Sequence, residues 1–231
     1  MLEFGHLTHP GRCRDLNEDT YYGNLDQGLW LVADGLGGRG FGEYASALAR
    51  KAIVHSVLSG QTLEQALRCA DQDIARVREH PRQPMGASVV TLHVQKTHYT
   101  MAWVGDTPAY VWQEAQLFSV RTLSARPLPH TLHPSAATAT GGAGRRRRTQ
   151  ALGITDPAHL QIDTYQGTIT PGIQWLLCSD GLSENVDPRA MAAVLQHPLY
   201  SAQECVDLLT ATALENGGLD NITILLIRAH V

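Results

Sequence analysis

The spacing of apolar residues changes along the chain, and each change separates predicted strands from predicted helices. Short apolar runs between polar turns predict three strands within residues 2–33. Apolar side chains then recur with the i, i+3, i+4 spacing of a helix over residues 44–57 and again over 63–77. Gly60 ends the first helix, and Thr62 is the expected N-cap of the second.

Strand patterns return after the second helix. Four apolar runs predict strands at residues 87–94, 98–106, 108–113 and 115–120. Their short connections favour an antiparallel meander. Beyond residue 150 the expected order is two strands at 160–169 and 173–180, helices near 187–196 and 201–215, and a last buried strand at 221–229. This order predicts an α+β fold in which two antiparallel sheets pack together and the helices lie outside.

Residues 121–150 interrupt the regular pattern. They combine proline, glycine, serine, threonine and alanine with four successive arginines, Arg145–Arg148. We interpret this interval as an irregular, flap-like surface excursion within a single domain of residues 1–231. The arginine run is interpreted as a solvated loop, and the alternative is that it attracts acidic or multiply phosphorylated substrates.

The composition of the chain argues against some classes of binding partner. The chain of 231 residues is 43% apolar and has a formal net charge of −4, which argues against nucleic-acid binding through bulk charge. No apolar run approaches the ~20 residues that span a bilayer, and the N-terminal residues do not resemble a secretion signal. The four cysteines lie far apart, as in a reduced cytoplasmic protein. We therefore expect a cytoplasmic protein without a membrane or nucleic-acid partner.

Aspartates follow several of the predicted strands. Asp34 and Asp180 each end an apolar run and are each followed by glycine, and Asp19, Asp106 and Asp220 lie in comparable turns. Carboxylates that approach one another repel unless a cation offsets their charge, and oxygen ligands favour magnesium, manganese or calcium. A single Asp-Gly pair is usually a turn. The spacing alone does not bring these acids together.

Eight short motifs occur in order: RDLNED (14–19), VADGLGG (32–38), GEYAS (42–46), MGAS (85–88), VGDT (104–107), ALG (151–153), LCSDGL (177–182) and DNIT (220–223). In this series the chain resembles the metal-dependent serine/threonine protein phosphatases, the type 2C or PPM family, in their compact bacterial form. The resemblance extends from about residue 5 to residue 229, apart from the 121–150 excursion. It implies a four-layer α-β-β-α sandwich with a binuclear Mn²⁺ or Mg²⁺ centre at one end.

The resemblance also implies a role for each acid. Asp34 would bridge two ions, with Asp180 and Asp220 on the first and the Gly35 carbonyl on the second. Asp19, with Glu18 nearby, would bind the waters of the second ion, and Asp106 with Asp180 resembles a third-ion site. Asn221 and Thr223 are expected only to shape the Asp220 turn.

Arg14 would bind the substrate phosphate, because its planar fork matches the phosphate oxygens. Two cations can lower the pKa of a bridging water and orient it for in-line attack on a phosphate monoester. Leu36 and Arg39 occupy positions where members of the family carry histidine, so we expect a metal-bound water to protonate the leaving oxygen. Arg39 is a further candidate for phosphate binding.

The resulting hypothesis is a monomeric phosphoprotein phosphatase that opposes a bacterial serine/threonine kinase in signalling. Small bacterial members of the family also regulate secretion machines such as the type VI system. The alternative is a catalytically weak pseudophosphatase that binds phosphoproteins as a regulatory scaffold. A divalent-cation buffer is a third class, but the sequence lacks the D-x-D-x-D-G loop of such proteins.

Overall fold

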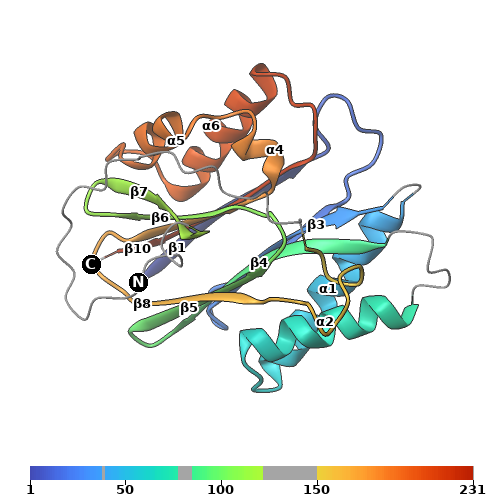
Figure 1. Cartoon of the computed structure of the whole chain (residues 1–231). Helices are drawn as coiled ribbons and strands as arrows, with labels where there is room; N and C mark the ends of the chain where they lie inside the picture. Colours follow the sequence, from blue (N-terminus) through green and yellow to red (C-terminus); the bar gives the residue numbers. More distant parts are fainter. Residues whose placement is uncertain (38–39, 78–84, 122–149, 231) are drawn as a thin grey trace, which may run out of the picture.

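Two five-stranded antiparallel sheets lie face to face, with helices on both outer sides (Figure 1). A computed structural model of the chain describes residues 1–37, 40–77, 85–121 and 150–230. The α+β, four-layer arrangement expected from the sequence is confirmed.

Each sheet contains strands from distant parts of the chain. The first sheet has the order β1 (Leu2–His9), β10 (Ile222–Ala229), β9 (Gln174–Cys178), β6 (Ala109–Gln113) and β7 (Gln116–Ser119). The second has the order β2 (Asp19–Asn24), β3 (Leu29–Leu36), β4 (Gly86–Gln95), β5 (His98–Val104) and β8 (Asp163–Thr168). Strands β1 and β10 pair along their whole length, from Leu2 opposite Ala229 to His9 opposite Ile222. The two ends of the chain are thereby joined in one sheet.

The helices cover the outer faces of the sheets. The second sheet is covered by α1 (Phe41–Leu58) and α2 (Leu63–Val77), and the first by α4 (Asp180–Ser183), α5 (Pro188–Leu195) and α6 (Ala202–Glu215). Apolar side chains fill all three interfaces, with Trp30 and Trp175 fully buried between the sheets. These contacts fix the ends of the strands that carry the acidic residues.

The helix ends follow the expected chemistry. Thr62 and Gln65 exchange side-chain and backbone hydrogen bonds at the start of α2, with Gln65 N donating to the Thr62 hydroxyl at 3.3 Å. Ser201 and Glu204 form the same arrangement at the start of α6. Both devices satisfy backbone N–H groups that the first turn leaves without a partner.

One expectation is wrong. The strands between residues 87 and 120 do not form a single meander, because β5 belongs to the second sheet and β6 to the first. The change of sheet occurs at Gly105, whose φ of 90° is a conformation that glycine adopts without strain. Most of the predicted 121–150 excursion, Arg145–Arg148 included, lies outside the described residues. Among the described helices, none has the length and apolar character needed to span a membrane.

Candidate metal centre

The acidic residues gather at one end of the sandwich. Asp19 is the first residue of β2 and lies directly opposite Asp34, near the end of β3. Asp180 begins α4 immediately after β9, and Asp220 lies in the turn before β10. Since β9 and β10 are antiparallel neighbours, Asp180 and Asp220 lie at the same end of the first sheet. Residues that span most of the chain therefore meet at one place.

Close backbone packing holds the second sheet and α1 together at this end. The Gly35 N–H donates to the Glu18 carbonyl at 3.2 Å. A Cβ on Gly35 would lie 2.1 Å from the Gly42 carbonyl oxygen of α1, and a Cβ on Gly42 would lie 2.6 Å from Glu18 Oε1. Only glycine fits at both positions, so the DGLGG and GEYAS motifs allow α1 to approach the acidic residues.

The carboxylates influence one another strongly. Burial, and then the charges of the neighbouring Asp19, Asp180, Asp220 and Asp106, raise the pKa of Asp34 to about 9. Burial raises the pKa of Asp19 to about 6, against the hydroxyls of Ser179 and Thr223, which favour its ionised form. The pKa of Asp180 is also raised to about 6, by burial and then by Asp220. The site thus has an excess of negative charge.

These residues fit a hard divalent cation. Asp19 is 8% exposed, and its Oδ2 atom is buried without a hydrogen-bond partner among the described residues. The available donors are carboxylate and carbonyl oxygens, which magnesium and manganese prefer. Within residues 1–37, 40–77, 85–121 and 150–230, no three His, Cys, Asp or Glu side chains yet form a group that could hold an ion. The carboxylates nevertheless influence one another through charge.

Arg14 lies beside the acidic residues on the exposed loop between β1 and β2. Its Nη2 atom donates to Asp220 Oδ2 at 2.6 Å, with 55% of the Arg14 side chain and 38% of the Asp220 side chain exposed. This hydrogen bond and the charge of Asp220 raise the pKa of Arg14. Asp220 therefore contacts a cation of the protein itself, and more than half of the Arg14 side chain stays exposed.

Asn221 joins the Arg14 loop to the Asp220 turn. It is 6% exposed, and its Nδ2 atom donates to the carbonyls of Pro10 and Leu16, both at 2.9 Å. Its Oδ1 atom accepts a hydrogen bond from the Glu18 N–H at 2.8 Å. The sequence interpretation confined Asn221 to the Asp220 turn. In the structure its side chain holds both ends of the loop that carries Arg14.

The remaining predicted residues have different surroundings. Asp106 is exposed in the turn after β5, where it is close enough to raise the pKa of Asp34. Leu36 ends β3 and is 37% exposed. Arg39 lies outside the described residues.

Sequence reasoning missed the supporting hydroxyls of Ser179 and Ser88, and it expected a third, that of Thr223, only to shape the Asp220 turn. Ser179 and Thr223 hydrogen-bond to Asp19 and lie inside the motifs that contain Asp180 and Asp220. Ser88 lies opposite Asp34 on β4, and its Oγ is 2.5 Å from Thr107 Oγ1, next to Asp106. The signal for these residues was their place inside the short motifs MGAS, LCSDGL and DNIT. Their partners became visible only when the strands were paired.

The chain matches a known family over most of its length. The model of the protein phosphatase 2C family matches residues 11–211. The serine/threonine phosphatase stp of Listeria monocytogenes is 29% identical over 238 residues, which cover 95% of this chain and 93% of that protein. The serine/threonine protein phosphatase PstP of Mycobacterium tuberculosis is 25% identical over 97% of this chain and 44% of that protein.

Solved structures share the whole fold. PppA, described as a key regulatory component of the type VI secretion system in Pseudomonas aeruginosa, has a TM-score of 0.79 and 26% identity, covering 99% of this chain and 97% of that one. The catalytic domain of the phosphatase PstP, in complex with two manganese ions, has a TM-score of 0.79 and 25% identity, covering 100% of this chain and 99% of that one.

Proposed function

Because the chain belongs to the protein phosphatase 2C family, we propose that its acidic residues hold the divalent ions used to hydrolyse phosphoserine and phosphothreonine. Serine/threonine phosphatase activity, dependent on Mn²⁺ or Mg²⁺, is the function of the family. The observation that carries the proposal is the convergence of Asp19, Asp34 and Asp180 on one end of the sandwich, each with a raised pKa. Such an excess of negative charge is offset by a bound cation.

The residues of the centre divide into those that hold ions and those that support them. In this proposal Asp34 would help to hold both ions, Asp180 and Asp220 would hold the first, and the Gly35 carbonyl with Asp19 and Glu18 would serve the second. Asp106, with Asp180, is the candidate for a third ion. When bound, the ions supply Lewis acidity that polarises the phosphoryl group and increases the acidity of water.

Arg14 has the separate task of binding the phosphate. Its guanidinium is exposed, positively charged and able to present two parallel N–H donors to the phosphate oxygens. Negative charge on these oxygens is offset where the guanidinium contacts them. Asn221 fixes the loop so that Arg14 is oriented before substrate arrives. Arg39 is a further candidate, proposed from the sequence alone.

The pseudophosphatase alternative is not favoured. A non-catalytic relative would be expected to lack some of the acids, whereas this chain retains Asp19, Asp34, Asp180 and Asp220 at one end of the sandwich. A protein that had lost metal binding would gain nothing from burying Asp34 among other carboxylates, since that burial is unfavourable without a cation.

In the cell, we propose that the phosphatase acts as a cytoplasmic monomer that reverses a cognate serine/threonine kinase. The four cysteines are unpaired, as in proteins of a reducing compartment. The similarity to PppA supports a role in regulating a secretion machine. A comparison of the phosphoproteome of the parent strain with that of a strain carrying Asp180→Asn would identify the substrates.

The direct test is metal-dependent hydrolysis. The purified chain should hydrolyse p-nitrophenyl phosphate and a phosphothreonine peptide in Mn²⁺ or Mg²⁺, and EDTA should abolish both reactions. Asp180→Asn should lose activity while retaining the fold by circular dichroism. Failure of the wild-type chain to hydrolyse either substrate in either metal, with normal binding of the phosphopeptide, would support the scaffold alternative instead.

A further inference from the structure

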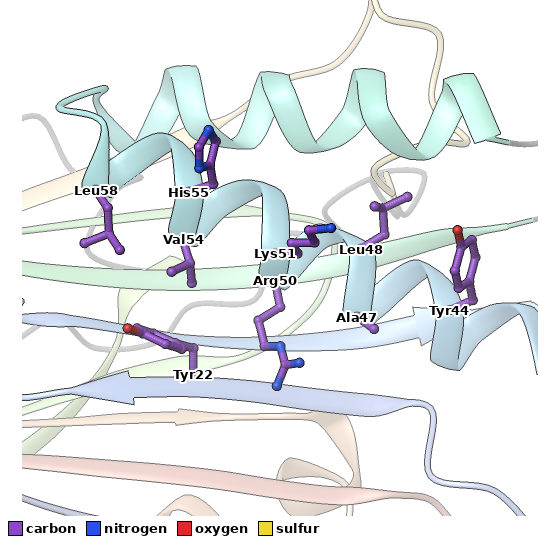
Figure 2. A pocket seen from close by; sticks show the side chains of 9 residues that line it. All are labelled: Tyr22, Tyr44, Ala47, Leu48, Arg50, Lys51, Val54, His55 and Leu58. Carbon is purple, nitrogen blue, oxygen red and sulfur yellow. The ribbon is translucent and has the colours of Figure 1, made fainter.

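A groove runs along the outer side of α1, and it is lined by apolar side chains with two cations between them. The apolar side chains are those of Tyr22, Tyr44, Leu48, Val54 and Leu58, and the cations are Arg50 and Lys51. The groove has a volume of about 830 Å³. We call it the α1 groove. In Figure 2, Tyr22, Val54 and Leu58 lie toward one end, Tyr44, Ala47 and Leu48 toward the other, and Arg50 between them.

The α1 groove arises because α1 carries more apolar residues than the core covers. One stripe, which includes Ala45, Ala49 and Ile53, is fully buried. A second stripe lies outside it, where Tyr44 is 51% exposed and Leu58 is 53% exposed. Large apolar side chains in a continuous exposed surface are typical of binding sites.

The positive charges that line the groove favour an acidic ligand. Arg50 and Lys51 are exposed, and in the part of the chain that the structure describes neither forms an ion pair. No acidic residue lines the groove, although the whole chain has a net charge of −4. A ligand with carboxylates beside its apolar side chains would match both features.

The neighbouring strand favours a polypeptide. Tyr22 belongs to β2, the outermost strand of the second sheet, and β3 is the partner with which it pairs in the described structure. The free edge of such a strand can hydrogen-bond to an added extended segment. A second copy of this chain fits less well, because a symmetric contact through the groove would place Arg50 and Lys51 of both copies together.

The groove also begins close to the acidic centre. Gly42 packs against Gly35 and Glu18, and Tyr44 follows two residues later on the same helix. From Gly42 to Leu58 the helix extends about 24 Å at its rise per residue. A peptide in the groove can therefore continue toward the centre.

We propose that the α1 groove binds an acidic, apolar-anchored segment of the phosphoprotein substrate, outside the residues next to its phosphate. This inference rests on the proposed function, because only a phosphatase would have a phosphoprotein substrate to bind in the groove. The groove contributes affinity and selectivity, while the acidic centre and Arg14 carry out hydrolysis.

The first test measures binding without catalysis. A fluorescein-labelled, unphosphorylated peptide of Glu and Leu residues is titrated with the full chain in EDTA, and fluorescence anisotropy is recorded. A second peptide carries Gln in place of each Glu. We expect the acidic peptide to bind more tightly, and Arg50→Glu to weaken its binding by roughly five- to tenfold. Arg189→Glu is the matched control, since Arg189 is an exposed arginine on α5, on the opposite side of the sandwich.

The second test separates the groove from the active centre. Two phosphopeptides are prepared, one extended by the Glu-containing sequence and one by the Gln-containing sequence. Their hydrolysis in Mn²⁺ is compared with that of p-nitrophenyl phosphate. Arg50→Glu and Leu58→Ala should raise KM for the acidic phosphopeptide and leave p-nitrophenyl phosphate hydrolysis unchanged. Equal binding of the Glu and Gln peptides would overturn the proposal, as would undiminished binding of the acidic peptide by Arg50→Glu. If the wild-type chain still hydrolyses p-nitrophenyl phosphate in that case, the proposed phosphatase function stands although the groove proposal fails. A wild-type dimer that Leu58→Ala converts to monomers in sedimentation would also overturn it.

Discussion

Arg14 forms an ion pair with Asp220, with 2.6 Å between Nη2 and Oδ2. The proposed phosphate ligand thus contacts a proposed metal ligand directly. If Asp220 holds an ion, its carboxylate would no longer be fully available to Arg14, and the guanidinium would be free to bind phosphate. We therefore expect metal binding and the availability of Arg14 to be linked through one carboxylate.

Replacing Arg14 should have opposite effects on two measurements. Arg14→Ala should lower kcat/KM for p-nitrophenyl phosphate by about 100-fold, because a positioned donor to the phosphoryl oxygens is lost. The same change should tighten Mn²⁺ binding in calorimetry, because Asp220 no longer pairs with arginine. Arg14→Lys should preserve part of the charge but not the two-donor fork. Weaker Mn²⁺ binding by Arg14→Ala would contradict the linkage.

The metal-free protein should become less stable as the pH rises. Asp19 and Asp180 have folded-state pKa values of about 6, and Asp34 of about 9, all above the ordinary value of 3.8. Stability from their protonated forms is complete below the unfolded-state pKa and is lost as the pH rises through the folded-state values. In EDTA, Tm should fall between about pH 5 and pH 9. Mn²⁺ should reverse this fall, so its stabilising effect should be larger at alkaline pH. A Tm that is constant over this range in EDTA would contradict the prediction.

Removing the charge of Asp34 should stabilise the metal-free fold and abolish function. Asp34→Asn keeps the shape of the side chain but no longer buries a carboxylate among four others. We expect a higher Tm in EDTA at alkaline pH, no further increase with Mn²⁺, and loss of hydrolysis. Asp26→Asn, in an exposed turn, is the control and should match the wild type in all three measurements. An Asp34→Asn protein that is less stable in EDTA than the wild type would count against the charge excess.

Asn221 should contribute both to stability and to substrate binding, although it is not one of the proposed metal ligands. Asn221→Ala removes three hydrogen bonds from Pro10, Leu16 and Glu18, which should lower the free energy of unfolding by about 2–3 kcal/mol. Because the same loop carries Arg14, KM for a phosphopeptide should rise. Asn216→Ala, which removes a single exposed hydrogen bond to Asn185, is the matched control and should leave KM unchanged. Urea unfolding measures the stability of each variant, and steady-state kinetics measure its KM. If KM is unchanged in Asn221→Ala, the residue stabilises the fold but does not position Arg14.

Local patterns and motifs predicted different parts of the molecule. Apolar periodicity located α1 and α2 within a few residues, because each helix buries one continuous stripe. It missed the change of sheet at Gly105, since a strand pattern records burial and not the identity of the neighbouring strand. The acidic residues were found through the motifs of a known family, since spacing alone could not bring Asp34 and Asp220 together. The Arg14–Asp220 pair and the Asn221 contacts join residues about two hundred positions apart, and no local signal encodes them.

The pairing of β1 with β10 has a consequence during protein synthesis. A chain still attached to the ribosome before β10 has emerged has an unpaired first strand and no turn to bring Asp220 to the centre. Contacts of such long sequence separation slow folding, because the intervening chain must first be ordered. We therefore expect a chain that still lacks β10 not to hydrolyse phosphoproteins.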